Sequence, residues 1–496
     1  MLRVLTMALR VASDDAERAR VHADLAARLL AAGRDRDATA HYAELVALDP
    51  GDPDHLAQLT DLAERTGLHA SLADALARGA EAIARAPGGD PALRLDLLVR
   101  AGTVRADVLE DPSGAIVHFS QVLASPEAPA EVALPVARRL STLLEAEGRD
   151  EPRLNVLERL ASLEPDRAAR RAVLGTAARL AERLGDTDRA LASWHARLRE
   201  TPGDAESLDA LVSLLTGAER WEPLINALHA RASAATDDAT RREDLVRVAE
   251  TYATRLGRVD EAVAAWAEVR REFGEDAQVV DALWALLGSA GRTGELLELL
   301  ARAASSEVDQ ARRAVLYQRA GDVLRSKGDL AAALNYYRAA LDDAPSEPGA
   351  RAGLCALLED ATASSEVGAA AVQVLARAYH ATDDWELTLG LVEHRLAATT
   401  DRPSRAAVLM EAAALQETRA GNVRAALASV GRALPLSVDD DASLQTVERE
   451  LHRLAGEAGD WQPAVLAYQT AVRAASRTTS ARRGCRSSSA PCSSRA

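Results

Sequence analysis

The residues that could carry nucleotide or covalent chemistry are few and poorly spaced for it. The single lysine, Lys327, is followed by Gly328 instead of Ser or Thr, so the chain has no Walker A loop and little means for Schiff-base chemistry. The run Gly288-Ser-Ala-Gly291 is one residue too short for a Gly-x-Ser-x-Gly nucleophile elbow. We therefore expect no catalytic residue, no cofactor and no enzymatic activity.

Metal-ligand spacing is equally absent from the sequence. The ten histidines form no His-Glu-x-x-His motif, and the nearest approach is His394 with the distant His380. The acidic run 439–441 lacks the alternating carboxylates and the glycine of a calcium loop. Cys355 sits in a helical stretch and Cys485 and Cys492 lie near the end, so neither zinc nor disulfide spacing results. We expect no metal site.

Charge narrows the classes of partner. The chain has 59 basic and 75 acidic side chains and a net charge of −16. Nucleic-acid binders need a basic face, and anionic membranes repel acidic proteins, so we expect neither a nucleic-acid partner nor membrane insertion. No window approaches the ~18 apolar residues of a membrane span. Arg10 interrupts the first apolar run too early for a signal peptide. A cytoplasmic location is expected, or a periplasmic or envelope-associated one if the true N-terminus lies upstream.

The elements that would position any site are helices. Alanine, leucine, arginine and glutamate dominate, aromatic residues make up only 3%, and no run alternates Val, Ile or Tyr with polar residues. The sequence therefore predicts an all-α fold.

The clearest copy of a sequence repeat is in residues 316–345. It contains, in order, an aromatic residue, a glycine, a turn glycine, a small residue, a second aromatic residue, a second small residue and a proline. These residues are Tyr317, Gly321, Gly328, Ala333, Tyr337, Ala340 and Pro345. This pattern resembles the tetratricopeptide repeat, with Leu324 in place of the family's mid-helix tyrosine. The resemblance implies two helices that cross at a tight turn, where the small residue allows close approach.

The alanine–aromatic pair of the second helix recurs along the chain. The pairs are Ala38 with Tyr42, Ala115 with Phe119, Ala190 with Trp194, Ala262 with Trp266, Ala333 with Tyr337, and Ala464 with Tyr468. A second aromatic slot, just past the turn, holds Trp221, Trp385 and Trp461. Because these slots recur with the repeat, we interpret the rings as interhelix packing and not as a platform for stacking bases or sugars.

Turns are predicted at Gly33, Gly67, Gly148, Gly185, Gly257, Gly291, Gly328, Gly421 and Gly459, and near Glu110, Glu219 and Asp383. Most steps are 34 to 38 residues, close to the tetratricopeptide period. Near-consensus and degenerate units alternate from 185 to 328. The resemblance implies a right-handed α-α superhelix, a tetratricopeptide-like solenoid of about twelve hairpins.

The predicted organisation has five segments. They are 1–14, a partial helix of a preceding repeat; 15–359, repeats; 360–382, an inserted loop and helix; 383–476, repeats; and 477–496, a disordered Arg/Ser tail. Three interpretations of the tail stay open: a basic contact for an acidic partner, a disordered terminus, or a shifted reading frame. We also hypothesise that the chain is a slice of a longer array.

Function follows from the resemblance in kind only. Tetratricopeptide arrays hold a partner peptide or helix on a concave face lined by first helices, which implies partner-binding roles for Gln318, Asp322, Arg325, Arg247 and Arg179. The alternative is that these side chains form ordinary solvated helix faces with no binding role. We expect a protein-interaction scaffold with a basic or neutral protein partner. The alternatives are a structural or assembly component of the bacterial cell envelope, and a regulatory segment of a larger enzyme.

Overall fold

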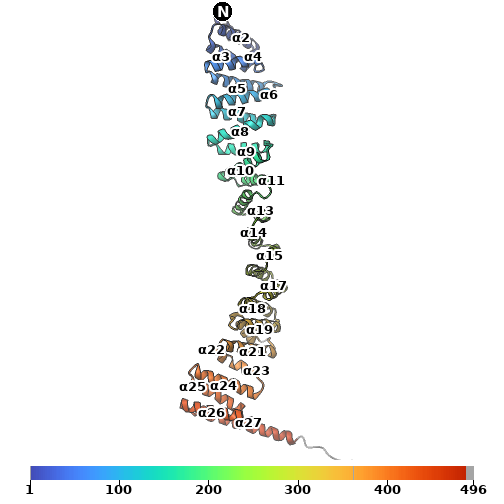
Figure 1. Cartoon of the computed structure of the whole chain (residues 1–496), viewed down its shortest axis with the longest axis vertical. Coiled ribbons are helices and arrows are strands. Elements are labelled where there is room, and N and C mark those ends of the chain that lie inside the picture. The colour runs from blue at the N-terminus through green and yellow to red at the C-terminus, as the bar shows by residue number, and fades with distance from the viewer. Residues whose placement is uncertain (1, 361, 488–496) are drawn as a thin grey trace, which may run out of the picture. The chain divides into compact units, whose positions relative to one another are not determined.

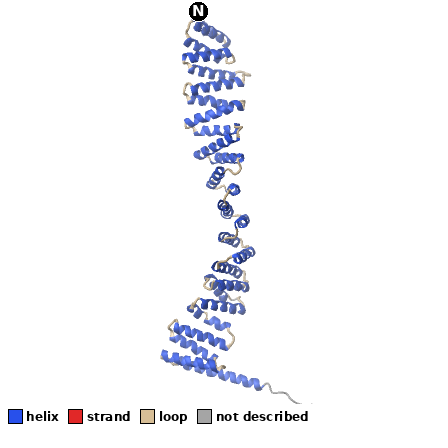
Figure 2. Cartoon of the chain, in the orientation of Figure 1, coloured by secondary structure: helices blue, strands red, loops and turns tan. Residues whose placement is uncertain are grey.

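The computed structural model describes residues 2–360 and 362–487, with side chains up to residue 474. All regular structure in this part of the chain is helical, and Figure 2 shows no strand there. The all-α prediction is thus confirmed. The chain divides into two units, Met1–Gly257 and Arg258–Ala496, which are described separately below.

In unit 1, consecutive helices stack in layers, as α5 to α9 show in Figure 1. Its core is continuous through these layers, from Ala43 on α3 to Leu144 on α8. The helices are α1 (Leu2–Val11), α2 (Asp15–Ala31), α3 (Asp35–Leu48), α4 (Pro53–Thr66), α5 (His69–Arg85), α6 (Pro91–Asp107), α7 (Pro112–Ala124), α8 (Ala130–Ala146), α9 (Asp150–Leu163), α10 (Arg167–Leu184), α11 (Thr187–Glu200), α12 (Ala205–Gly217), α13 (Trp221–Ala234), α14 (Asp238–Thr251) and the π-helical η1 (Tyr252–Leu256).

Unit 2 is built in the same way, with one core running from Ala314 to Leu391 and another from Leu396 to Ala471. The helices are α15 (Val259–Phe273), α16 (Ala277–Ser289), α17 (Thr293–Ser306), α18 (Gln310–Ser326), α19 (Leu330–Asp343), α20 (Pro348–Glu359), α21 (Ser365–Ala381), α22 (Trp385–Gly390), α23 (Val392–Ala398), α24 (Arg402–Thr418), α25 (Val423–Ala433), the 3₁₀ turn η2 (Leu434–Leu436), α26 (Asp441–Ala458) and α27 (Gln462–Ser487).

The turns explain where the helices end. All twelve positions predicted as turns have positive φ, nine of them at glycine and three at Glu110, Glu219 and Asp383. A positive φ reverses the chain at the helix end and costs a side-chain-bearing residue some strain. Aspartates such as Asp329 then begin the next helix, since its carboxylate accepts the amide hydrogen of Ala332 at 3.1 Å.

Close approach of the helices depends on small residues opposite the aromatic slot. Ala333 and Tyr337 have no exposed surface, and a Cβ added at Gly321 would lie 2.6 Å from the Tyr337 ring. Gly102 meets Phe119 in the same way in unit 1, also at 2.6 Å. The six alanines of the slot are buried, as are Phe119, Trp194, Trp266 and Tyr337, whereas Tyr42 and Tyr468 are half-buried.

The interval between the turns at Gly328 and Asp383 holds a surplus helix, though not where the sequence suggested. Helix α21 leads directly into the turn at Asp383, so it serves as the first helix of that hairpin. The surplus helix is therefore α20, which packs on α18, α19 and α21. Within the polar stretch 360–366, residues 360 and 362–364 form the loop between α20 and α21, residues 365 and 366 begin α21, and residue 361 lies outside the described residues.

The two terminal segments also differ from expectation in detail. Helix α1 covers most of the segment 1–14, and its place in a preceding repeat stays a prediction. Helix α27 continues to Ser487, so residues 477–487 of the predicted disordered tail are helical. Residues 488–496 of that tail lie outside the described residues.

Enlarging Ala333 tests the packing of the clearest hairpin. We expect Ala333→Leu to lower the free energy of unfolding by roughly 1 to 3 kcal/mol, because the side chain has no space beside Tyr337. Ala331→Leu is the matched control, since Ala331 is exposed on the same helix. Thermal melting followed by circular dichroism measures both, and equal melting temperatures would contradict this account.

Histidines of unit 1 make its stability depend on pH. His22 and His41 lie with their Nδ1 atoms 3.0 Å apart, and burial lowers the pKa of both below the usual 6.5, with the charge of His41 lowering that of His22 further. Burial likewise lowers the pKa of His118 and His195. Below pH 6.5 the unfolded chain therefore binds protons that the folded chain does not, so stability is present above that pH and falls as the pH drops.

We accordingly expect amide hydrogen exchange in α2 and α3 to accelerate between pH 7.5 and 5.5, after correction for the intrinsic exchange rate. His22→Gln removes one of the two ring nitrogens that compete for protons, so the acceleration should be smaller in that variant. His394→Gln, at an exposed histidine of unit 2, is the control and should behave as the wild type. An undiminished acceleration in His22→Gln would remove the pair as its cause.

Candidate functional site: the first-helix face

We use the term first-helix face for the surface formed by the helices that precede the left-handed turns. These helices are α2, α4, α6, α8, α10, α12 and α14 in unit 1, and α16, α18, α21, α24 and α26 in unit 2. The residues for which the sequence predicts a partner-binding role lie on α10, α14 and α18, so they belong to two different units.

Gln318, Asp322 and Arg325 are brought together on α18, around the hydroxyl of Tyr337. That hydroxyl donates to Asp322 Oδ1 at 2.6 Å, Arg325 Nε donates to the hydroxyl oxygen at 3.3 Å, and Gln318 Nε2 donates to Asp322 Oδ2. Burial and the bond to Asp322 raise the pKa of Tyr337, so the phenol stays protonated and donating. The hydrogen bonds of these three side chains are thus made within the hairpin, which they stabilise.

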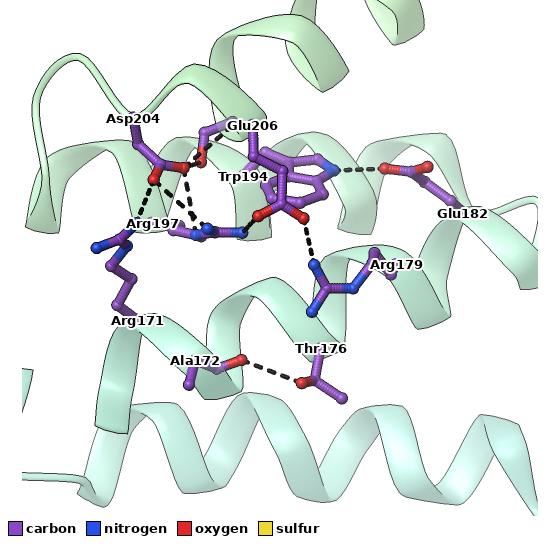
Figure 3. Close-up of polar contacts among 10 residues, drawn as sticks. Arg171, Ala172, Thr176, Arg179, Glu182, Trp194, Arg197, Asp204 and Glu206 are labelled. Atoms are coloured by element: carbon purple, nitrogen blue, oxygen red, sulfur yellow. Dashed lines mark hydrogen bonds and ion pairs between the residues drawn. The ribbon is translucent and has the colours of Figure 1, made fainter. Parts of the chain in front are cut away.

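Arg247 and Arg179 each reach a neighbouring first helix. Arg247 donates from Nη2 to the hydroxyl of Thr216 on α12 at 2.9 Å. Arg179 forms an ion pair with Glu206, also on α12, as Figure 3 shows. Both residues link layers of unit 1.

A buried charge network surrounds Arg197 in the same region (Figure 3). Its guanidinium lies 5.2 Å above the Trp194 ring, 2.6 Å from Glu206 and 3.3 Å from Asp204. A Cβ on Gly175 would lie 2.8 Å from Arg197 Nη1, so that glycine leaves the space the guanidinium occupies.

The carboxylates of this network are held charged. Burial raises the pKa of Asp204, but hydrogen bonds from Ser207 and the charges of Arg197 and Arg171 outweigh it and keep that pKa below its usual value. The pKa of Glu206 is also lowered, because Arg197 and Arg179 overcome the effect of burial. Since each charge has a partner inside the protein, the network fixes α10, α11 and α12 together.

An apolar cavity of 380 Å³ opens between the first helices α6 and α8, and the sequence did not predict it. Leu95, Val99 and Thr103 of α6 line one side, and Val132, Pro135 and Val136 of α8 line the other. The ring of Phe119 contributes from α7, the intervening second helix. Pro135 and Glu131 at this cavity are exposed, whereas Val99 and Thr103 are half-buried.

One arginine forms part of the wall of this cavity. Arg139 of α8 is ion-paired with Asp107 of α6, and its guanidinium lies 5.8 Å from the centre of the Phe119 ring. A cation over an aromatic face is attracted by the ring's quadrupole. Asp107 and Phe119 therefore hold Arg139 against the cavity.

Unit 2 has a cavity of 520 Å³ in the corresponding place, between α16 and α18. Val280 and Asp281 line it from α16, and Val315 and Arg319 from α18. Arg319 is paired with Asp281 at 2.6 Å and lies 5.4 Å from the Trp284 ring. Arg139 and Arg319 each stand nine positions before their turn glycine, Gly148 or Gly328, so the two arginines share one repeat position.

A periodic signal for these cavities was present in the sequence. When first helices are aligned on their turns, Val99 and Val280 occupy the same position, eleven residues before Glu110 and Gly291. The sequence analysis instead predicted partner binding for polar residues of three helices, because polar side chains often contact ligands. The distance between adjacent first helices decides whether a cavity exists, and this distance cannot be read from the sequence.

The described residues contain no group of three or more His, Cys, Asp or Glu side chains arranged to hold a metal ion. No helix among them combines the length and apolar character needed to cross a bilayer.

No protein-family model matches the chain, and no curated protein matches it. Solved structures that resemble it include YrrB, titled a TPR protein with an unusual peptide-binding site (16% identity, 36% of this chain and 88% of that chain, TM-score 0.23). A tetratricopeptide repeat protein from Parabacteroides merdae is similar at 16% identity over 53% of this chain and 97% of that chain, with a TM-score of 0.22. The TPR domain of P58(IPK) is similar at 14% identity over 88% and 98%, with a TM-score of 0.20.

These likenesses are too distant to bear on ligand or mechanism. The classification instead depends on the chain's own geometry: twelve left-handed turns near the family's period, small residues against aromatic rings, and helices that stack on their neighbours within each unit. On that geometry, each unit has a fold of stacked helix hairpins like that of tetratricopeptide repeats.

Proposed function

We propose that this chain is a non-catalytic interaction scaffold that holds a peptide or helix of a partner protein on its first-helix face. The observation that carries the proposal is the cavity between α6 and α8, which lies between two first helices and is lined mainly by branched aliphatic side chains and Phe119. Apolar concavities with a few polar groups at their edges are where proteins bind ligands.

The polar residues for which the sequence predicts partner binding support this choice indirectly. Gln318, Asp322 and Arg325 bond to one another and to Tyr337, and Arg179 and Arg247 bond to α12. A partner would have to compete with these internal bonds to use them. The aliphatic walls of the cavity carry no such competing bond.

Cavities also lie between second helices. One of 560 Å³ between α11 and α13 includes Leu198 and Leu208 in its lining. Another of 320 Å³ between α7 and α9 is lined by Ile116, Leu123 and Val156. Apolar linings thus occur on both faces, and the first-helix face is chosen because the family that the sequence resembles binds partners there. One experiment can compare the two faces.

Site-specific photocrosslinking in the cells that naturally produce the protein tests the proposal. Benzoylphenylalanine replaces Asp96, at the cavity between α6 and α8, in one variant and Val117, an exposed residue of the second helix α7, in the other. We expect discrete adducts of defined mass from position 96 and none from position 117. Mass spectrometry of the adducts identifies the partner and the segment that binds.

Two results would contradict the proposal. One is an adduct pattern at position 117 equal to that at position 96, which would mean that the first-helix face is not the binding surface. The other is the absence of adducts at position 96 while the variant remains folded, as measured by its melting temperature.

A further inference from the structure

We infer that the cavity between α6 and α8 is a specificity pocket for one aliphatic side chain that is followed or preceded by Lys or Arg in the partner segment. The inference depends on the proposed function and adds the chemistry of what is bound. Three features of the cavity lead to it: its walls, its arginine and its rim.

The walls require an apolar side chain. Leu95, Val99, Val132 and Val136 present only hydrocarbon, and Phe119 adds a ring. At ~25 cal/mol for each Å² of apolar surface, a buried Leu or Ile side chain gains roughly 1.5 to 3 kcal/mol. A polar side chain placed there would lose its hydrogen bonds to water without replacement.

The arginine in the wall is not available to an acidic ligand. Arg139 is paired with Asp107 of α6, and its guanidinium lies 5.8 Å from the centre of the Phe119 ring. An incoming carboxylate would have to displace Asp107, so this cation does not select for acidic segments. Arg139 therefore contributes to the wall a guanidinium whose charge is already paired with that of Asp107.

The rim selects for a cation. Glu131 is exposed beside the cavity, and no hydrogen bond or ion pair of its carboxylate is present in the described part of the chain. Pro135 has no N–H, so the carbonyl of Glu131 also lacks its usual helical donor. Asp96, the second rim carboxylate, is paired with Arg100 at 2.8 Å, so Glu131 is the one of these two carboxylates that is left without an ionic partner.

Part of this combination recurs in unit 2. The cavity between α16 and α18 has Val280 and Val315 in its wall, together with Arg319, which is already paired with Asp281. Its rim differs, because Glu275 is paired with Arg302 at 3.5 Å and Glu307 accepts the amide hydrogen of Asp309 at 3.0 Å. The two cavities therefore share an apolar wall and a paired arginine, whereas the unpaired rim carboxylate is a feature of the cavity between α6 and α8.

A peptide-display selection on the full-length protein tests the inference. Random twelve-residue peptides on phage are selected on the wild type, and the enriched sequences are synthesised for fluorescence-polarisation measurements of Kd. We expect enrichment of Leu, Ile, Val or Met beside Lys or Arg. Val99→Phe fills the cavity and should raise Kd about tenfold, whereas Glu131→Arg should raise it about threefold, as for one exposed charge pair.

Matched variants control for general effects of each change. Val117→Phe adds the same volume on the exposed face of α7, and Glu298→Arg makes the same charge change on α17. Both should leave Kd within about twofold of the wild type, as expected for changes outside a binding site. Circular dichroism melting shows whether each variant is folded, and Glu131→Arg, at an exposed position, keeps the test valid if Val99→Phe does not fold.

The outcomes separate the two proposals. Enriched peptides that are acidic, or that bind Val99→Phe and Glu131→Arg as tightly as the wild type, would overturn the pocket while position 96 could still crosslink a partner. Failure of both the selection and the crosslinking at position 96 would overturn the scaffold function itself, and the pocket with it.

Discussion

A helix hairpin of this length cannot hide its apolar surface by itself, and everything else in the structure depends on how this is solved. Each hairpin buries one face on the next, which requires the helices to approach closely and the chain to reverse sharply. Gly102 against Phe119 and Gly321 against Tyr337 give the close approach. The twelve positive-φ residues at the predicted turns give the reversals, and three of them bear side chains, which shows that the turn is kept even at some conformational cost.

Arginine side chains link helices to one another, both between hairpins and within them. Arg170 forks onto Glu200 at 2.9 and 3.1 Å, and Arg313 forks onto Asp343 at 2.6 Å through both nitrogens. Each also donates to the backbone carbonyl six residues before it, Arg170 at 2.9 Å and Arg313 at 3.3 Å. A planar guanidinium can serve two acceptors in fixed directions, which lysine cannot do. The near absence of lysine therefore has a structural use here, whatever its origin.

This internal use of charge shapes the surface that is left for partners. Where arginines and carboxylates satisfy one another, as around Arg197, the first-helix face is a closed network. Between α6 and α8 the first-helix face lacks such a closed network, and a cavity with aliphatic walls opens there, with an unpaired carboxylate at its rim. The excess of acidic over basic side chains means that such leftover charges are more often negative. Basic, apolar segments are the ligands that suit a surface of this kind.

The sequence by itself determined the fold class and the positions of the turns. Periodic Gly, Ala and aromatic residues report local requirements, a left-handed φ or a close helix contact, and these act within some twenty residues of chain. Tyr337, Ala333 and Gly328 could therefore be assigned without coordinates. An inserted helix was predicted in this interval but was placed within 360–382, because nothing local in Pro348–Glu359 distinguishes a surplus helix from a repeat helix.

The tertiary structure alone decided what the first-helix face offers. Asp322 looked like a free ligand in the sequence, and only its distance to the Tyr337 hydroxyl shows that it is occupied. Val99 and Pro135 looked ordinary, yet they face one cavity, because two helices separated by α7 in the chain border the same space. Occupancy and cavities depend on distances between separate hairpins, and no residue pattern within one hairpin encodes those distances.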